Sequence, residues 1–370
     1  DPRDLWQQGS ARTRLFPSRY ERAPYELVAA AGRADLLRLI HCALEYLHHL
    51  RALPYARLWP FPDAVPSVLA FRLDTDRASR SRIDAFAQLS SDLGIPFTWF
   101  IDTASHDGWL ERFAAMQGQE IGVHCYRHRS FTAPEGYITD IHEARRRLNA
   151  VGLAVEAYAA PFGIWNPALG EALEGLEVPY SSEFGIGYDT LPFYPEIPGR
   201  RYSTLQVPVH PISPGALRRV GYSPGKMEAY YADLLVRKIA RAQPLFLYDH
   251  PIHGYAELGR TVLAEALRAG ARPVTLGGFA RWWRRRAAVL HVGDKAIAAD
   301  GLSLHLSTPG GESFVPLVPR EGQSPAPQGE GPTRSRALFH APEGIRDTRE
   351  FDLRTTIGAA FQAMSRRRQR

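Results

Sequence analysis

The stretch SVLAFRLDTD, residues 67–76, decides the fold because it reads as a buried strand that ends in two acids. Its first half is apolar, as in a strand that is covered on both faces of a parallel sheet. A helical pattern follows over residues 81–93, and a second apolar run, PFTWFID, occupies residues 96–102. Alternation of strands with helices is typical of parallel β/α architecture.

The same alternation continues to about residue 288. The later strand-like runs are EIGVHCYRH (120–128), VEAYAAPFG (155–163), YSSEF (180–184), LQVPVHPI (205–212) and LFLYDHP (245–251). Because helical patterns separate most of these runs, we predict an α/β fold, a (β/α) barrel of about seven strands over residues 66–288. Polar residues cluster where the strands end, which is where barrel enzymes carry their catalytic groups.

The flanking segments have other patterns. Residues 1–65 predict an N-terminal helical segment, with helical spacing over 25–52, followed by a Pro-rich connector. Residues 289–320 alternate apolar and polar residues between Gly turns, which predicts a small C-terminal β appendage. Residues 321–370 are rich in Pro, Gly and Ser and end in arginines, so we expect a disordered linker and a basic C-terminal tail.

Composition limits the classes of function. The formal net charge is +6, but much of the excess lies in runs at 284–286 and 366–370. We find no interleaving of basic and aromatic residues, so we expect no nucleic acid partner; a contact of the basic tail with a membrane or an acidic glycan fits better. Two cysteines, Cys42 and Cys125, cannot make a disulfide framework. With no signal-peptide pattern either, we expect a cytoplasmic location.

Two pairs of residues point to a metal. His124 and His128 are four apart at the end of a strand, where one turn brings both imidazoles to one side, although two unrelated loop histidines would look the same. Asp74 and Asp76 alternate onto one strand face, where a cation would neutralise them; otherwise they cap the next helix or face solvent. One carboxylate with two imidazoles leaves positions open for water and substrate, as in hydrolytic sites.

A third element is YDHPIH, which supplies His250 and His253 after another strand. An imidazole titrates near neutral pH, so one placed across the pocket can protonate a departing amine. An isolated His-Pro pair is more often structural.

Taken in chain order, these motifs resemble those of the polysaccharide deacetylases, the NodB-homology group of carbohydrate esterases, which have a distorted (β/α) barrel. AFRLDTD resembles the first motif, which implies Asp74 as catalytic base and Asp76 as metal ligand. HCYRH resembles the second motif and implies His124 and His128 as the other ligands. LYDHP resembles the fifth motif, which implies His250 as general acid.

The third and fourth motifs are resembled by AAPFG and YSSEF, which implies a substrate groove near them. Our groove candidates are Arg72, Pro161, Phe162, Trp165, Ser182 and Glu183. The sequence departs from the third motif at Ala159, where the family has an Arg that pairs with the base. Arg72 lies on the same strand face as Asp74, about 7 Å along it, so we predict that Arg72 takes over this pairing. Alternatively Arg72 pairs with Glu183 or Asp189, or reaches solvent.

The resemblance implies a metal-dependent hydrolase that removes an acetyl group from an N-acetylated sugar of a glycan or glycan precursor, in cell-surface polysaccharide biosynthesis. We expect zinc first, although the same ligands accept cobalt, nickel or iron. Two alternatives stay open. One is a catalytically impaired sugar-binding or scaffold protein on the same barrel, and the other is a hydrolase of non-sugar amides.

Overall fold

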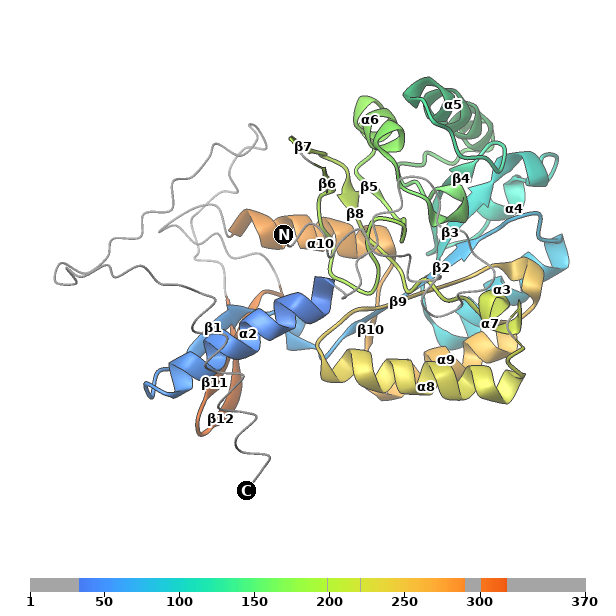
Figure 1. Ribbon diagram of the computed structural model, residues 1–370. Helices are drawn as coiled ribbons and strands as arrows, with labels where there is room; N and C mark the ends of the chain where they lie inside the picture. Colours follow the sequence, from blue (N-terminus) through green and yellow to red (C-terminus); the bar gives the residue numbers. More distant parts are fainter. Residues whose placement is uncertain (1–32, 198, 220, 290–300, 318–370) are drawn as a thin grey trace. The chain divides into compact units, whose positions relative to one another are not determined.

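The computed structural model describes residues 33–197, 199–219, 221–289 and 301–317 (Figure 1). Strands and helices alternate through its main part. The elements of the first half are β2 (Val68–Asp74), α3 (Arg80–Leu93), β3 (Thr98–Asp102), α4 (Glu111–Ala114), β4 (Glu120–Cys125), α5 (Pro134–Ala150) and α6 (Pro167–Gly175). Those of the second half are β5 (Tyr180–Ser181), β6 (Glu196–Ile197), β7 (Arg200–Arg201), β8 (Leu205–Gln206), α7 (Pro214–Arg219), α8 (Pro224–Ala240), β9 (Leu245–Asp249), α9 (Ala256–Arg268), β10 (Arg272–Pro273) and α10 (Leu276–Val289).

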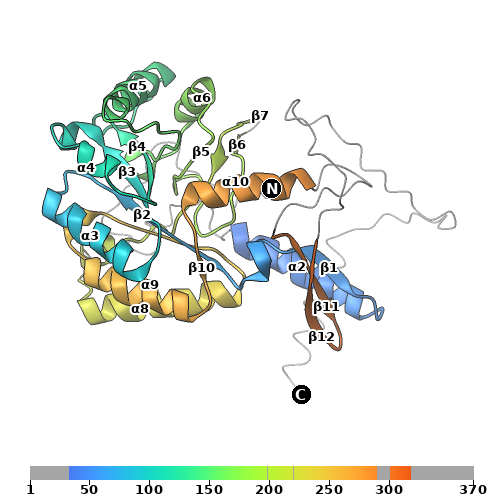
Figure 2. The same ribbon diagram turned by 180° about the vertical axis from the view of Figure 1, so that it is seen from behind.

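Strand β2 is the centre of a parallel sheet. It pairs with β9 along one edge and with β3 along the other, where β10 also meets its first residues; β4 lies beyond β3. All of these pairings are parallel, and helices run between the strands in both views (Figures 1 and 2). The prediction of a parallel α/β fold is therefore confirmed.

Main-chain hydrogen bonds continue past the regular sheet. Val123 of β4 is bridged to Tyr158, and Tyr158 to Ser181 of β5. Strand β5 pairs with β8, and the His210 N–H donates to the Phe246 carbonyl of β9 at 2.7 Å. These contacts lead from strand to strand back to the sheet, but the pairings at β5 and β8 are only two residues long. The arrangement is therefore a (β/α) barrel with one irregular half.

The two faces of β2 enter different parts of the core. Leu69, Phe71 and Leu73 pack with the surrounding helices, whereas Val68 and Ala70 pack in a second cluster with side chains from the other strands. Because side chains alternate along a strand, the next two even positions, which are Arg72 and Asp74, also lie on the inner face. Both are buried.

A separate antiparallel sheet flanks the barrel. It has the order β1 (Tyr55–Leu58), β11 (Ser303–Thr308), β12 (Gly311–Pro316), and α2 (Arg33–His49) contacts its first strand. The sequence predicts the β1 segment as a connector and β11–β12 as a C-terminal appendage, whereas the structure joins them in one sheet through pairs such as Ala56 with Leu306. Local patterns cannot reveal a pairing between segments so far apart in the chain.

Parts of the predicted flanks lie outside the described residues. These are residues 1–32 and 290–300, and the predicted linker and basic tail from residue 318 onward. Within the described residues, no helix has both the length and the apolar character needed to cross a bilayer.

Candidate active site

Three strands of the parallel sheet, β9, β2 and β4, carry the predicted site residues to one edge of it. Asp74 ends β2, and Asp76 lies two residues beyond it. His124 belongs to β4 and His128 to the loop that follows, while His250 comes directly after β9. Since carboxyl ends of parallel strands meet at the same edge, five side chains from three separate parts of the sequence come together.

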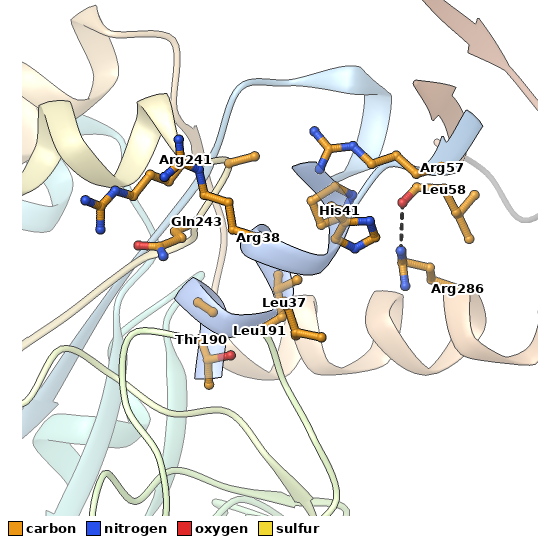
Figure 3. Close-up of a pocket in the computed structure, with 13 residues that line it drawn as sticks. Leu37, Arg38, His41, Arg57, Leu58, Thr190, Leu191, Arg241, Gln243 and Arg286 are labelled. Carbon is orange, nitrogen blue, oxygen red and sulfur yellow. Dashed lines mark hydrogen bonds between the residues drawn. The ribbon is translucent and has the colours of Figure 1, made fainter. Parts of the chain in front are cut away.

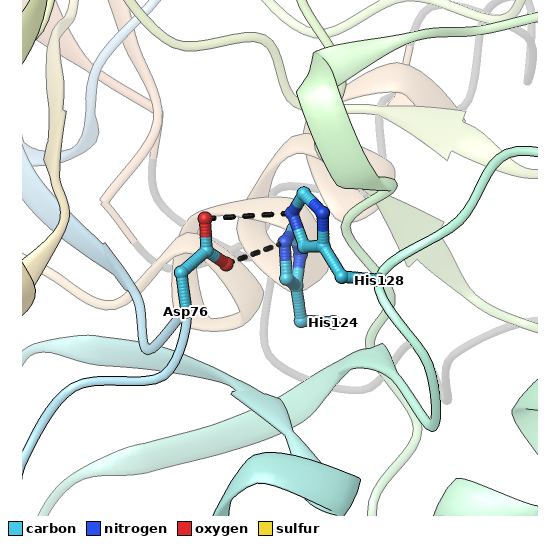
Figure 4. Close-up of side chains that lie close together, drawn as sticks. All are labelled: Asp76, His124 and His128. Carbon is cyan, nitrogen blue, oxygen red and sulfur yellow. Dashed lines mark ion pairs between the residues drawn. The ribbon is translucent and has the colours of Figure 1, made fainter.

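Asp76, His124 and His128 form a group that could hold a metal ion (Figure 4). The His124 Nε2 lies 3.0 Å from Asp76 Oδ1, and the His128 Nε2 lies 3.4 Å from Asp76 Oδ2. A tetrahedral zinc ion with bonds of about 2.0–2.1 Å separates its ligand atoms by about 3.4 Å. The spacing of these atoms therefore suits a common metal ion between them.

The hydrogen bond on the other side of the His124 ring supports this interpretation. Its Nδ1 lies 2.7 Å from the carbonyl oxygen of Ala159, which can only accept, so Nδ1 carries the proton. In the neutral ring, Nε2 then presents a lone pair to the Asp76 carboxylate. The His124 Nε2 and Asp76 Oδ1 are both buried without a hydrogen-bond partner in the described structure. Two facing acceptors need a cation between them.

The electrostatics of the pair also favour positive charge. Burial lowers the pKa of His124, but the nearby charges of Asp76 and Asp74 outweigh it and raise this pKa to about 9. Burial opposes ionisation of Asp76, yet His124 and His128 hold the pKa of Asp76 well below its usual range. The site thus stabilises a cation at this position, either a second proton on His124 or a metal ion.

Arg72 holds Asp74 through two hydrogen bonds. Its Nε donates to Oδ1 at 2.7 Å and its Nη2 to Oδ2 at 2.6 Å, which is the bidentate geometry of an Arg–carboxylate pair. The Arg72 Nη1 donates to Ser182, and the guanidinium lies against the rings of Phe100 and Tyr248, at 5.3 and 5.6 Å. The contact predicted from the strand alternation is present.

The other acids considered for Arg72 have partners of their own. Glu183 accepts the Ala160 N–H at 2.9 Å and the Ser181 hydroxyl at 2.8 Å. Asp189 is bonded to His210 and Lys238.

His250 faces the acids from across the sheet edge. Its Nε2 lies 3.5 Å from Asp76 Oδ2 and 4.0 Å from Asp74 Oδ2. Burial lowers the pKa of His250, although the two carboxylates oppose this shift. The neighbouring His253 has its ring 5.7 Å from that of His250, and burial together with His250 lowers its pKa to about 4. Of the two, His250 is the one placed to exchange a proton beside Asp74.

Residues 68–181 match the family model of the polysaccharide deacetylases, which confirms the resemblance predicted from the motifs. The chain carries a polysaccharide deacetylase domain. A search of curated proteins found no significant match to this sequence.

Solved structures share the fold of this deacetylase domain. One described as Puue Allantoinase has a TM-score of 0.54 at 15% identity, covering 61% of this chain and 93% of its own. A protein from Pseudomonas aeruginosa PAO1, whose name assigns it to the polysaccharide deacetylases, has a TM-score of 0.52 at 15% identity, covering 61% of this chain and 94% of its own. A protein from Mycobacterium smegmatis with the same assignment in its name has a TM-score of 0.51 at 16% identity, covering 61% of this chain and 93% of its own. At these identities the similarity shows the fold alone.

Most groove candidates are buried in the described structure. These are Arg72, Pro161, Trp165, Ser182 and Glu183, whose side chains expose little surface to a groove, and their part in substrate binding stays a prediction. Phe162 is different: it is 51% exposed, with its ring 4.6 Å from that of His128. Its φ of 63° is unusual for a bulky residue and is often found at functional positions.

Sequence reasoning missed two groups that position the candidate metal-binding histidines. One is the Ala159 carbonyl, which receives the His124 ring proton. The other is Asp140 of α5, whose carboxylate accepts the N–H groups of Tyr126 and Arg127 at 2.8 and 3.0 Å, in the segment between the two histidine ligands. An acid in the buried stripe of an otherwise amphipathic helix was the available signal.

Proposed function

We propose that this protein is a metal-dependent hydrolase that removes the acetyl group from an N-acetylated sugar of a glycan or glycan precursor. One observation carries the proposal. A carboxylate fixed by a bidentate arginine, Asp74, lies beside an Asp–His–His group with metal-ligand spacing, inside a polysaccharide deacetylase domain.

Asp76, His124 and His128 would hold the metal. Three protein ligands leave coordination open for water and substrate, as in catalytic rather than structural sites. When bound, a divalent metal supplies Lewis acidity, which polarises an amide carbonyl and makes a water easier to deprotonate. We propose zinc, and the same nitrogen and oxygen ligands also suit cobalt, nickel or iron.

The remaining residues would move protons. Asp74 is the base that takes a proton from the attacking water, and Arg72 keeps both of its carboxylate oxygens in fixed positions. His250, 4.0 Å from Asp74, gives a proton to the departing sugar nitrogen. Acetate and a free amine are the products.

The pairing of Arg72 with Asp74 also bears on the alternative of an impaired, sugar-binding protein. One of the two reasons for that alternative is Ala159, which stands where the family has an arginine; the other is the presence of flanking segments outside the barrel. Because Arg72 provides a bidentate partner for the same acid, the loss at Ala159 does not leave Asp74 unpaired. This favours an active enzyme.

The test is acetate release by the full chain loaded with zinc, on a panel of N-acetylated glycans, nucleotide sugars and lipid-linked sugars. Asp74→Asn, which keeps the shape of the side chain and removes its basicity, should release none. Binding of the glycans without acetate release would identify a sugar-binding protein instead. Hydrolysis of cyclic or other non-sugar amides alone would identify the other alternative.

We further propose that the reaction belongs to cell-surface polysaccharide biosynthesis, and that it modifies a precursor in the cytoplasm. The basic C-terminal tail is proposed to contact a membrane or an acidic glycan. Cell fractionation of the full-length protein tests the location.

A further inference from the structure

Helix α2 exposes its apolar side. The large apolar residues exposed along the helix and just beyond it are Leu37, Leu39, Ile40, Leu44, Tyr46, Leu47, Leu50 and Leu53. Leu39, Ile40 and Leu47 are exposed by 67%, 55% and 56%. At 100° per residue, those within Leu37–Leu50 fall within one half of the helix circumference. A continuous apolar surface of this kind on a described part of the chain needs an explanation.

The polar side of α2 is the one that packs on the protein. His41 bonds to the Tyr55 hydroxyl at 2.6 Å, and the ring of His48 lies edge-on to that of Tyr55 at 5.2 Å. The His49 Nε2 lies 3.3 Å from the Ser307 hydroxyl. A surface helix normally buries its apolar side, so α2 is reversed. Its outward leucines are therefore available to something other than the described residues that pack against the polar side.

A basic pocket lies at the same helix (Figure 3). Its volume is about 270 Å³, and it is lined by residues of α2, β1, α10 and the segments at 190–191 and 241–243. The charged or titratable side chains among its lining residues are Arg38, His41, Arg57, Arg241 and Arg286, with no acid among them. Leu37, at the edge of the exposed apolar face, also lines the pocket, so the two features are continuous.

The positive charges of the pocket are not neutralised by acidic side chains in its lining. The guanidinium of Arg286 donates to the carbonyl oxygens of Leu58 and Trp59, at 2.8 and 3.0 Å, which are neutral partners. Burial lowers the pKa of Arg286 to about 10, a sign that its charge is poorly compensated. Arg57 donates to His305, and Arg241 pairs with Asp35 at 3.1 Å, outside the pocket lining. An anion in the pocket would be attracted by several guanidinium groups at once.

We propose that the outward face of α2 and this pocket together dock the protein on an anionic lipid surface, with a headgroup phosphate in the pocket and the leucines among the acyl chains. An anionic amphiphile satisfies both features at once. A second copy or an apolar protein segment would cover the leucines and leave the arginines uncompensated, whereas a soluble phosphate would do the reverse. The proposal concerns a surface distinct from the acid and histidine site and does not depend on the proposed reaction.

The experiment is co-sedimentation of the full chain with vesicles of phosphatidylcholine, alone or mixed with phosphatidylserine. We expect binding to the mixed vesicles, weakened by salt. The variant Ile40→Gln/Leu44→Gln/Leu47→Gln should lose at least about tenfold in affinity, because each side chain gives up apolar burial. Val236→Gln, an exposed apolar position on α8, is the matched control and should bind as the parent does.

The pocket has its own variants. Arg38→Gln and Arg57→Gln should each weaken binding to the mixed vesicles by about fivefold, since a basic residue near such a surface contributes about 1 kcal/mol. Arg268→Gln, an exposed arginine on α9, is the matched control for charge. Acetate release from a water-soluble substrate should be unchanged in all of these variants, which separates this proposal from the proposed reaction.

Three results would overturn the proposal. The full chain fails to bind either kind of vesicle. The leucine variant turns a dimer into a monomer in light scattering while vesicle binding is unaffected, which would assign the face to a second copy. Inorganic phosphate binds tightly in calorimetry while the leucine variant keeps full vesicle affinity, which would make the pocket a site for a soluble anion.

Discussion

At the scale of single residues, the orientation of Asp74 depends on a residue of its own strand. Arg72 is fully buried, lies against two aromatic rings, and donates to both oxygens of the acid. A lysine cannot reproduce this planar fork, and a methionine removes the charge altogether. The arginine is a positioning residue, because it is buried beneath the site and its hydrogen bonds go to Asp74 and Ser182.

Replacing Arg72 should therefore lower turnover more than substrate binding. We expect Arg72→Lys to reduce kcat by about 100-fold, the size of loss that a small misplacement of a catalytic group can cause, with KM nearly unchanged. Arg72→Met should lose more and be less stable, because it leaves Asp74 buried without its partner. Steady-state kinetics with metal content measured in parallel test this. A lysine variant with full kcat would show that the fork is not needed.

The two histidines proposed as metal ligands give a second prediction. His124→Ala and His128→Ala should each abolish stoichiometric metal binding and acetate release while leaving the circular dichroism spectrum unchanged, because both residues lie at strand ends rather than in the apolar core. Elemental analysis of the purified variants is the measurement. His142→Ala, an exposed histidine on α5, should keep its metal. Full occupancy in either ligand variant would refute the assignment.

The histidines after β9 should differ from one another. His250→Ala should lower kcat by about 100- to 10,000-fold, the usual contribution of a general acid, and keep its metal. His253→Ala should have a much smaller effect, because no close approach to Asp74 or Asp76 is seen for its ring, whereas His250 lies within 4.0 Å of both acids. The reverse ranking of the two variants would place the general acid three residues later than we propose.

At the scale of elements, β2 shows what a local pattern can and cannot predict. The two-residue period of a strand predicted that Arg72 and Asp74 lie on the face of β2 that points to the barrel interior, and the structure has that arrangement. The same pattern does not tell how deeply a side chain is buried below the protein surface. Ser182 and Trp165 were therefore proposed as groove residues, although both are buried in the structure.

Helix α5 matters to the site through one side chain. Asp140 accepts hydrogen bonds from two main-chain N–H groups in the segment that joins the two proposed histidine ligands, so it helps to hold that segment in place. Asn can accept through only one of its side-chain atoms. We expect Asp140→Asn to weaken metal affinity by about 10- to 100-fold, the usual effect of losing such a supporting contact. Competition with a chelator measures it, and Glu135→Gln, exposed on the same helix, should leave the affinity unchanged.

At the scale of the whole molecule, long-range pairing is what the sequence could not reveal. The alternation of strands and helices from residue 68 to 289 is a local signal, and it predicted the parallel fold. The sheet of β1 with β11 joins Tyr55 to Ser307, and neither segment contains a sign of its partner. Likewise, the reversed polarity of α2 has meaning only once the packed side is known.

Stability of the whole protein should depend on Asp249 at the end of β9. This carboxyl group is buried, and burial raises its pKa to about 8, helped by the charge of Asp74 and opposed by the His250 N–H that it accepts at 2.7 Å. In the unfolded chain its pKa returns to about 3.8. Between about pH 4 and pH 8, the folded state thus keeps a proton that the unfolded state releases.

The sign of the pH dependence follows from this difference. A raised folded-state pKa stabilises the protein fully below about pH 4, and this stabilisation is lost as pH rises through about 8, with a slope of at most about 1.4 kcal/mol per pH unit. Asp249→Asn mimics the protonated group and keeps an oxygen for the His250 N–H, so its free energy of unfolding should fall less between pH 5 and 8. Urea unfolding of both proteins at equal metal content measures the difference. Identical pH profiles would mean that Asp249 is already ionised in the folded protein. Strand β9 would then end in a buried negative charge close to that of Asp74.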